Sequence, residues 1–388
     1  MSTASRASPP PIAIRGTGLA LPAHSATQQQ FAEFFIERLA LKAHDARFVR
    51  LISRKSGILR RHACILNSTN PDDRPLSQDL YPAPHLPEPG LGDRMLAYAE
   101  HAGPLARTAA HRAIDDASSG TALSPSSITH LVTFSCTGFN APGIDQRLIA
   151  DLGLSHAVER IHIGFMGCHA AINALRVARA IIAADLGATV LVAGVELSSL
   201  HLLRTDRRDQ LVASCMFGDG AAAVVLSAGP ARFELIDTFS RIIPDSSAQM
   251  GWSIGSHAFE MTLGEAVPDL IGQAAPSLWP QMTRGAGEPP DRLRDHALWC
   301  VHPGGPRVLE EVEQSLTLRP DAMDASRAVL RDLGNMSSVT TLFILDRLKR
   351  SETPGVRPRS VIALAFGPGL ACEGAVLRLG DGTQAASA

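Results

Sequence analysis

The chain has 388 residues, of which 45% are hydrophobic and 19% are charged, a composition typical of folded proteins with one or two buried cores. Its 36 lysines and arginines nearly balance its 38 aspartates and glutamates, so the formal net charge is only -2. This balance excludes a nucleic-acid partner or an electrostatic membrane anchor for the chain as a whole. Any anion site must therefore be local.

The cysteines and the lack of targeting segments bear on the cellular compartment of the protein. Six cysteines occur without a Cys-x-x-Cys pair, which favours neither a zinc site nor a disulfide framework and suits a reducing cytoplasm. The N-terminal residues lack the apolar segment of a secretion signal, and the most apolar later stretch, residues 186–195, is too short to span a bilayer. We expect the first ten or so residues, and the tail from Gly380, to be poorly ordered.

Short β-branched runs alternate with alanine-rich helical stretches, which is the pattern of an α/β protein with buried sheets. In the first part of the chain this pattern predicts strands at residues 12–21, 128–134, 161–165 and 189–195, and helices at residues 94–119 and 168–184. In the second part it predicts strands at residues 233–243, 298–301 and 361–365, and a helix at residues 339–349. Between the two parts, residues 217–226 turn on glycines and run into another buried strand.

Three glycine-rich runs each contain one reactive or hydrogen-bonding side chain. Cys168 ends the run Gly-Phe-Met-Gly-Cys, His302 begins His-Pro-Gly-Gly-Pro, and Asn335 is second in Gly-Asn-Met-Ser-Ser. A thiol can attack acyl groups, an imidazole can tune the thiolate, and a carboxamide can donate to an enolate or oxyanion. Taken singly, each has a structural explanation, as a small core residue, a satisfied polar residue or a turn former. The catalytic interpretation requires that the three meet in space.

The position of Cys168 between a predicted strand and a predicted helix also bears on its ionisation. Free N–H groups and the helix dipole at a helix N-terminus stabilise negative charge. We therefore expect the pKa of the Cys168 thiol to fall.

Together with Phe-Gly-Asp-Gly-Ala-Ala-Ala at residues 217–223 and Phe-Gly-Pro-Gly at residues 366–369, these runs resemble the type III polyketide synthases, the chalcone and stilbene synthase group of the thiolase superfamily. The resemblance covers roughly residues 12–379 and includes the spacing of the three runs. It implies an α/β, thiolase-like five-layer αβαβα fold built from two similar βα halves, residues 1–232 with the cysteine and residues 233–388 with the histidine and asparagine. It also implies a homodimer.

The family mechanism needs no cofactor and no metal besides its coenzyme A substrates. By resemblance, Cys168 takes a starter acyl group from coenzyme A as a thioester, with His302 holding the thiolate as an ion pair. Malonyl-CoA then loses carbon dioxide, and His302 and Asn335 donate hydrogen bonds to the resulting enolate. Attack of this carbanion on the Cys168 thioester extends the chain by two carbons, and repetition followed by ring closure gives a pyrone, a resorcinol or a related aromatic.

Further residues carry over from the family one by one. Phe217 corresponds to a gatekeeping aromatic between the coenzyme A tunnel and the inner cavity, where an apolar face assists decarboxylation; its structural alternative is a core residue beside a glycine turn. The positions that line the starter pocket or the cyclisation cavity are Cys136, Thr137, Ala141, Glu196, Ser198, His201, Met261, Ser337 and Pro368. Here the chain departs from the chalcone-forming pattern, because Ala141 replaces a methionine that a partner subunit supplies and His201 replaces a threonine. These changes favour room for a long acyl starter.

Coenzyme A needs cations for its phosphates. Residues 47–61 hold six arginines or lysines without an acidic residue between them. Lys55 falls where the family places a phosphate-contacting lysine, Arg50 lies near another such position, and Leu51 replaces one family cation. The alternative for each is a solvated helix face. Gly304 and Gly305 would let the pantetheine arm approach the backbone closely.

Three other functions are compatible with parts of this pattern. A ketoacyl-ACP synthase III has the same Cys, His and Asn set but performs one condensation with a carrier-protein donor; the Pro-Gly-Gly-Pro run after His302 and the Gly-Pro-Gly loop at Gly367 argue against it. A papain-like hydrolase would need a Cys-Gly-Ser-Cys-Trp type of context. A non-catalytic acyl-CoA-binding protein would be indifferent to the loss of Cys168.

Overall fold

The structure is a computed structural model that describes residues 11–70, 72, 76–118, 123–231, 233–351 and 359–380. Residues 1–10 and 381–388, for which the sequence predicts poor order, lie outside the described residues. In the part of the chain that is described, none of the helices is long and apolar enough to cross a membrane.

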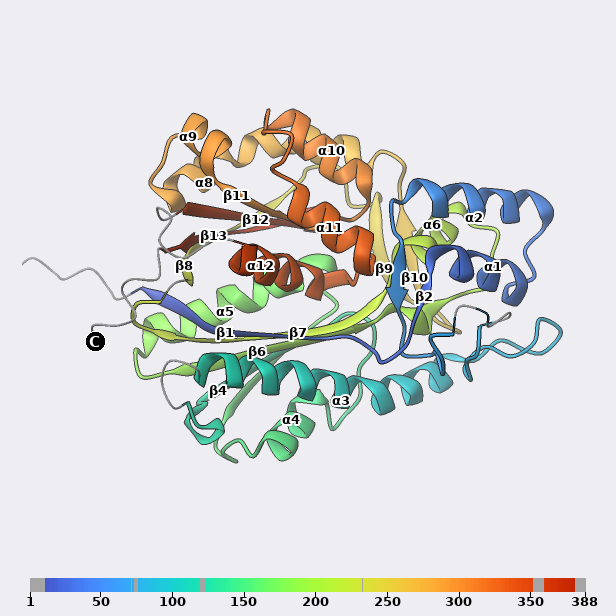
Figure 1. Cartoon of the computed structure of the whole chain (residues 1–388), viewed down its shortest axis with the longest axis horizontal. Helices are drawn as coiled ribbons and strands as arrows, with labels where there is room; N and C mark the ends of the chain where they lie inside the picture. Colours follow the sequence, from blue (N-terminus) through green and yellow to red (C-terminus); the bar gives the residue numbers. More distant parts are fainter. Residues whose placement is uncertain are drawn as a thin grey trace, which may run out of the picture.

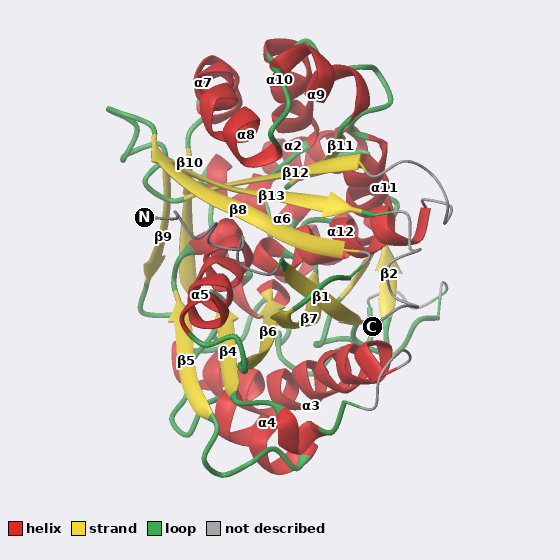
Figure 2. Cartoon of the chain, turned by 90° about the vertical axis from the view of Figure 1, so that its left-hand side faces the viewer, coloured by secondary structure: helices red, strands yellow, loops and turns green. Residues whose placement is uncertain are grey.

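The elements stack in five layers, which Figure 1 and Figure 2 show from two directions. One outer layer consists of α3 (Leu91–Ser118) and α4 (Ile144–Leu152). The central helical layer consists of α5 (Ala170–Ala184) and α12 (Thr340–Ser351). The other outer layer consists of α7 (Val267–Ala274), α8 (Trp279–Ala286), α9 (Pro290–His296) and α10 (Pro306–Ser315). A sheet lies on each side of the central helices, which is the αβαβα arrangement that the sequence predicts.

Four strands of each half follow the same order. The first half supplies β1 (Ile12–Ala20), β4 (His130–Ser135), β5 (Glu159–Gly164), β6 (Thr189–Leu197) and β7 (Asp219–Ala228), in the spatial order β5-β4-β6-β7-β1. The second half supplies β8 (Phe233–Ile242), β11 (Leu298–Val301), β12 (Arg359–Gly367) and β13 (Ala371–Leu379), in the order β11-β12-β13-β8. Apart from β5, which pairs parallel with β4, each half has one parallel pair followed by two antiparallel pairs. The second half thus repeats the first.

The two sheets join at one edge and differ at the other. Strands β1 and β8 pair over Ile12↔Leu235 and Ala13↔Glu234, so that nine strands form one continuous sheet. Beyond β4 the first half adds β5 as an edge strand, whereas the described part of the second half has no strand beyond β11. The helix α11 (Asp324–Leu333) lies beside β11 instead. The edge of β11 therefore borders a helix rather than another strand.

The close approach of the layers depends on small side chains. Ala170, Ala174 and Ala178 recur every four residues along α5 and are fully buried, which places them on one face of the helix. Helix α5 packs on strands of both halves, and its buried residues form one core with those of α12. Large side chains at these positions would push the two sheets apart. This packing fixes the start of α5, and with it Cys168.

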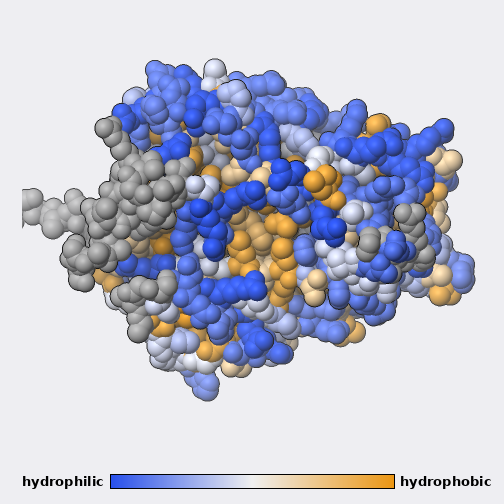
Figure 3. Space-filling model, viewed as in Figure 1, coloured by the Kyte–Doolittle hydropathy of each residue, from blue (hydrophilic) through white to orange (hydrophobic). Residues whose placement is uncertain are grey.

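Further elements cover one end of the layers. They are β2 (Ser25–Thr27), α1 (Gln28–Arg38), α2 (Ala43–Lys55), β3 (Arg60–His62), α6 (Arg208–Met216), and the hairpin of β9 (Met250–Ile254) and β10 (Phe259–Leu263). Short 3-10 helices are η1 (Pro125–Ser127), η2 (Gly167–His169), η3 (Ser198–His201), η4 (Ala275–Leu278) and η5 (Ser337–Val339). In Figure 3 the face seen in Figure 1 is hydrophilic over its outer helices and has an apolar area near its middle.

The predicted strands and helices are confirmed, with ends shifted by a few residues. The helix predicted from residue 168 begins as the 3-10 turn η2 and becomes α-helical at Ala170. Strand β7 begins at Asp219, directly after the predicted glycine turn.

Candidate active site

Cys168 lies in the turn η2 between β5 and α5, where the backbone is strained. Phe165 has a φ of 57° and Gly167 a φ of 77°. A Cβ atom at Gly167 would lie 2.2 Å from Cδ of Pro368, so glycine is required there for space as well as conformation. Strain of this kind persists where the surrounding structure holds a reactive group in place. In this turn Cys168 is buried, with 9% of its surface exposed.

His302 and Asn335 come from the second half. His302 directly follows β11, and Asn335 precedes η5 and α12. The Ser337 N–H donates to Oδ1 of Asn335 at 2.8 Å, which leaves the Asn335 NH₂ group as the donor of this amide. His302 is 1% exposed, and within the described structure neither of its ring nitrogens has a hydrogen-bond partner. Unpartnered buried nitrogens cost stability, and a water or ligand in the adjoining cavity would partner them.

The three predicted catalytic residues line one cavity of about 580 Å³. Cys168, His302 and Asn335 are buried, while Lys55 and Arg208 on the same cavity wall are exposed. The cavity therefore leads from the surface to the thiol, and we call its outer end the mouth. Much of the wall between is apolar, with residues of α2, α6 and α7. The convergence of the two halves on which the catalytic interpretation depends is present.

Burial determines the ionisation of this site at rest. Burial raises the pKa of the Cys168 thiol to about 12, although the Ser337 hydroxyl 3.7 Å away lowers it. Burial, together with nearby His169, lowers the pKa of His302 to about 3. The expectation that the helix N-terminus lowers the pKa of Cys168 is wrong for this resting structure, because desolvation of a thiolate outweighs the dipole of one helix end. Burial thus favours the neutral form of both groups, and no hydrogen bond joins them within the described structure.

Phe217 stands where this cavity meets two smaller ones. It lines the main cavity, an inner cavity of about 30 Å³ that also contains Cys168, and a second inner cavity of about 30 Å³. The buried Arg61 guanidinium donates to the Phe217 carbonyl at 2.6 Å, and the Phe217 backbone bridges to that of Asn335. The backbone of Phe217 is thus held at the boundary predicted for a gate.

Comparison with known proteins decides which family carries this constellation. The family model described as "Chalcone and stilbene synthases, N-terminal domain" matches residues 2–230, and that described as "Chalcone and stilbene synthases, C-terminal domain" matches residues 234–379. The chain belongs to the chalcone and stilbene synthase family. It is a type III polyketide synthase by family and an acyltransferase of the condensing class.

Similar proteins come from bacteria, plants and algae. The "Alpha-pyrone synthesis polyketide synthase-like Pks18" of Mycobacterium tuberculosis is 32% identical over 291 residues, which cover 73% of this chain and 72% of that protein. The bisdemethoxycurcumin synthase of Oryza sativa subsp. japonica is 32% identical over 384 residues, covering 94% and 92%. The crystal structure of PKS-I from the brown alga Ectocarpus siliculosus superposes with a TM-score of 0.86 at 29% identity, covering 97% of this chain and 100% of that chain.

In this synthase most of the predicted pocket residues surround Cys168. The inner cavity beside the thiol is lined by Cys136, Thr137, Ser198, Met261, Ser337 and Pro368. Met261 and Cys168 also face the main cavity. Three predicted residues, Ala141, Glu196 and His201, are not among the residues that line the inner cavity.

Glu196 is a buried link between the halves rather than a pocket wall. Its carboxylate accepts hydrogen bonds from the Cys136 N–H at 3.0 Å, from the Thr137 hydroxyl at 2.9 Å, and from the Ser338 hydroxyl. Burial raises the pKa of Glu196 to about 7, and these hydrogen bonds lower it. This fully buried side chain therefore joins the loop after β4 to the start of η5.

His201 and Ala141 lie outside the lining of the inner cavity beside Cys168. His201 stacks on Phe259 at 4.3 Å between ring centroids and hydrogen-bonds the Thr137 carbonyl, so it lines only the second inner cavity. Ala141 is exposed on the loop after β4. Neither residue lines the inner cavity beside Cys168 in this chain.

Trp252, to which the sequence pattern gives no role, borders the inner cavity beside Cys168. Trp252 of β9 lines both inner cavities, and its indole N–H donates to the Cys136 carbonyl at 2.6 Å. Together with Ser198 and Phe217 it stands between the two cavities. The only sequence signal is a large aromatic residue in a short hairpin, which says nothing about what the hairpin covers.

The predicted coenzyme A residues are only partly at the mouth. Lys55, Gly304 and Gly305 line the main cavity. Arg50 does not line it and instead makes a two-pronged ion pair with Glu33, at 2.8 and 2.7 Å. Two cations that the sequence analysis did not select, Arg208 and Arg307, line the cavity near its mouth.

Proposed function

We propose that this synthase holds a small acyl starter on Cys168 and extends it with malonyl-CoA through decarboxylative condensation, followed by ring closure. The observation that supports this proposal is the shared cavity of Cys168, His302 and Asn335, which a coenzyme A thioester reaches from the mouth beside Lys55. The reaction uses a thiol, an imidazole and an amide. It therefore requires no resident cofactor or metal, and the free thiol suits a reducing cytoplasm.

Loading begins with the thiol in its neutral form. Cys168 attacks the acyl-CoA carbonyl while its proton passes to the unpartnered imidazole of His302, which then protonates the departing coenzyme A thiolate. The S–C bond to Cys168 forms as the S–C bond to coenzyme A breaks. Proton transfer within the bound complex removes the need for a thiolate in the free enzyme.

Extension uses the same two donors. Malonyl-CoA binds with its thioester oxygen near the Asn335 NH₂ group and a His302 N–H, which stabilise the enolate formed as carbon dioxide leaves. Phe217 offers an apolar face to the malonyl carboxylate, and this face favours its loss. The enolate carbon then attacks the Cys168 thioester, so that the chain moves to coenzyme A two carbons longer.

The size of the inner cavities argues for short products. Each inner cavity offers only about 30 Å³ of room for the centre of a water-sized molecule, against about 580 Å³ in the main cavity. A long acyl chain on Cys168 does not fit into either inner cavity unless side chains move. We propose a short starter and few extensions, which is compatible with a pyrone or a small aromatic product.

A homodimer completes the proposal. Strand β5 is the edge of the sheet, most of its residues are exposed, and Ile161 on it is 41% exposed. Next to it, Phe139 and Met166 are 50% and 39% exposed. An exposed edge with apolar side chains invites pairing with a second copy. Such a contact would place Ala141 of one copy near the cavity of the other.

The test is to incubate the protein with labelled malonyl-CoA and acyl-CoAs of graded length and to identify the products by mass. Two or more condensations on a short starter, without carrier protein, support the proposal. A single condensation that requires a carrier-protein donor would identify a ketoacyl-ACP synthase III activity instead. Release of free acid from the starter alone would identify a hydrolase.

A further inference from the structure

Arg61 is a buried arginine to which the mechanism proposed above gives no role. It is the last of the six cations in residues 47–61, but only 2% of its surface is exposed, and it lines the second inner cavity rather than the main one. The ring centres of Phe31 and Phe35 lie 4.3 and 5.3 Å from its Cζ atom. An arginine enclosed in this way is not a surface contact for phosphates, so its presence requires another explanation.

The guanidinium of Arg61 caps the C-terminal end of α6. The last carbonyls of a helix have no partner within the helix. Nη1 of Arg61 donates to the carbonyls of Ser214 at 2.8 Å and Phe217 at 2.6 Å, and a cation at this end also opposes the negative pole of the helix dipole. Phe217 is the C-cap residue of α6, so this cap acts directly on the gate.

The backbone of Phe217 is joined to the loop of Asn335. The Asn335 N–H donates to the Met216 carbonyl at 3.0 Å, and the Gly218 N–H donates to the Asn335 carbonyl at 2.9 Å. These two hydrogen bonds lie on either side of Phe217 in the sequence. They therefore fix the gate, which comes from the first half, relative to Asn335 from the second half.

The stem of Arg61 packs against the same loop. Gly334, directly before Asn335, has a φ of 77°. A Cβ atom at Gly334 would lie 2.9 Å from Cγ and 3.0 Å from Cδ of Arg61, so glycine is required there for conformation and for the close approach of this stem. One side chain thus contacts the gate through its guanidinium and the loop of Asn335 through its methylenes.

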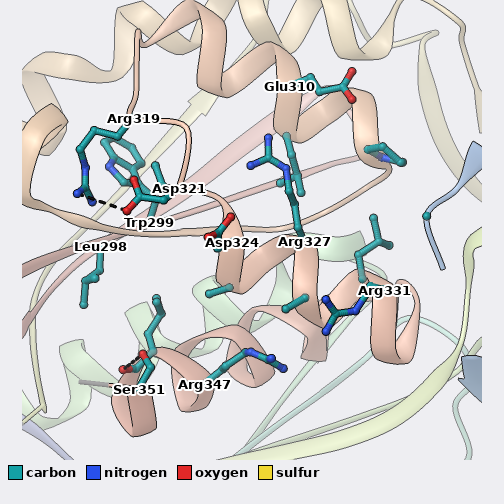
Figure 4. Close-up of a pocket in the computed structure, with 18 of the residues that line it drawn as sticks. Leu298, Trp299, Glu310, Arg319, Asp321, Asp324, Arg327, Arg331, Arg347 and Ser351 are labelled. Carbon is teal, nitrogen blue, oxygen red and sulfur yellow. Dashed lines mark hydrogen bonds and ion pairs between the residues drawn. The ribbon is translucent and has the colours of Figure 1, made fainter. Parts of the chain in front are cut away.

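Arg331 of α11 lies only four residues before Asn335, but its surroundings are different. Its side chain is half exposed and pairs with Asp332 at 2.8 Å. It lines a hollow of about 880 Å³ between β11 and helices α10, α11 and α12, which Figure 4 shows. Loss of such an exposed pair has little effect on stability, which makes Arg331 a suitable control for Arg61.

The charge of Arg61 is not matched by its surroundings. Among the residues that the structure describes, its Nε and Nη2 atoms have no hydrogen-bond partner. Burial lowers the pKa of Arg61 to about 10, so the group is still charged at neutral pH. Stability alone seldom explains a buried charge of this kind. Methionine would keep an apolar stem without the charge, so Arg61→Met removes the cap but retains most of the packing.

We propose that Arg61 is a positioning residue for decarboxylation, because it holds the Phe217 carbonyl and the backbone before Asn335 and so keeps both side chains aligned with the malonyl group. This proposal rests on the function proposed above, in which Asn335 supports the enolate and Phe217 faces the carboxylate. Arg61 acts through these two residues and does not touch the substrate. Acylation of Cys168, which uses His302, does not depend on it.

The test separates the two half-reactions. Arg61→Met should lower kcat for malonyl-CoA decarboxylation roughly 10- to 100-fold, since a misplacement of about 1 Å in a catalytic group costs about 10²-fold. KM for malonyl-CoA and the rate at which labelled acetyl-CoA acylates Cys168 should stay within about twofold, because neither depends on the alignment of Asn335. Arg61→Lys keeps a cationic donor for the two carbonyls and should recover part of the loss. If Arg61→Met does not fold, Arg61→Lys carries the same comparisons.

Two control variants separate positioning from general damage. Arg94→Met removes an equally buried arginine that also donates to a carbonyl, that of Leu200, and lies over the ring of Tyr81. Arg331→Met removes the exposed arginine near Asn335. Neither control should change the ratio of decarboxylation to acylation.

A double-variant cycle tests whether Arg61 acts through Asn335. In an Asn335→Ala background, Arg61→Met should lower decarboxylation by a smaller factor than in the wild type, because the amide that it aligns is gone. The remaining effect then comes from Phe217. An equal factor in both backgrounds overturns the proposal.

Hydrogen exchange measured by mass spectrometry reports the positioning without turnover. Segments that contain the Gly218 and Asn335 amides should exchange roughly tenfold faster in Arg61→Met than in the wild type, and at the wild-type rate in Arg331→Met. Unchanged exchange in Arg61→Met, or an equal loss of decarboxylation and acylation, overturns the positioning role. A wild-type protein that does not decarboxylate malonyl-CoA would overturn the proposed function instead, while the exchange still reports on Arg61.

Discussion

Trp252 is the side chain whose removal tests the size argument most directly. It separates two inner cavities of about 30 Å³ each, so Trp252→Ala should join them and add the volume of the lost indole. The variant loses the hydrogen bond to the Cys136 carbonyl and edge-to-face contacts with His201 and Phe259. A fully buried Trp→Ala change costs about 3–5 kcal/mol of unfolding free energy. Because Trp252 is half-buried, we expect the lower end, about 3 kcal/mol.

The larger cavity should improve catalysis with a longer starter, because it can bury more of the starter's apolar surface. Hexanoyl-CoA has four more methylenes than acetyl-CoA, and each buried methylene stabilises the bound state by about 0.8 kcal/mol. Full burial in the joined cavity is then worth about 3 kcal/mol, which corresponds to a factor on the order of 100. The ratio of kcat/KM for hexanoyl-CoA over acetyl-CoA should rise by about this factor in Trp252→Ala, and the products should become heavier.

The assay is product mass and initial rate with starters of graded length, for the wild type, Trp252→Ala and Trp279→Ala. Trp279 is a matched control, since it is also half-buried and makes an edge-to-face contact with Trp299, but it belongs to the outer layer of α8. An unchanged starter preference in Trp252→Ala would refute the reasoning about the cavity. So would an equal change in Trp279→Ala, because it would reflect destabilisation alone.

Three further predictions concern the catalytic residues and the pH. Cys168→Ala should abolish polyketide formation but retain malonyl-CoA decarboxylation, which release of labelled carbon dioxide measures; loss of both would place the thiol in the decarboxylation step. Asn335→Ala should lower decarboxylation about 10²–10³-fold, and a wild-type rate would show that its amide does not support the enolate. His201 accepts from the Phe259 N–H and donates to the Thr137 carbonyl, and burial lowers its pKa to about 3, so the folded state excludes a proton that the unfolded state binds below pH 6.5. Its contribution to stability is thus full above pH 6.5 and falls as the pH drops, by about 2 kcal/mol at pH 5; urea unfolding of His201→Thr should show a smaller loss between pH 7.5 and 5, and an equal loss would contradict this assignment.

Local patterns in the sequence were sufficient to predict the strands and the helix after Cys168. They also sufficed to select the three residues that meet at the cavity. The helix begins two residues later than predicted because the strained turn at Gly167 delays it. The sequence pattern predicted that strands and helices recur in the second half, but it did not predict their shared strand order, since strand order depends on pairings between distant segments. The hairpin β9–β10, which supplies Trp252 and Met261, lies in a segment for which no element was predicted.

Three expectations depended on the surroundings of a residue, which local sequence does not encode. A helix N-terminus predicts a lowered thiol pKa, but the depth of burial of Cys168, which no local pattern encodes, reverses the direction. An alanine and a histidine were expected beside the starter, but the inner cavity is bordered by Trp252 from another segment instead. Arg50, which the sequence suggested as a phosphate contact, forms an ion pair with Glu33, because α1 packs on α2 and places Glu33 beside it.

By itself, the sequence determined which chemical groups this protein can use, because a thiol, an imidazole and an amide in their glycine-rich turns are local features. Only the tertiary structure decided what surrounds them: the burial that favours a neutral thiol and imidazole, the small inner cavities and the arginines beside the mouth. The physical reason is that desolvation, cavity volume and net local charge are sums over residues far apart in the chain. Such sums exist only once the two halves and the segments that cap them have packed together.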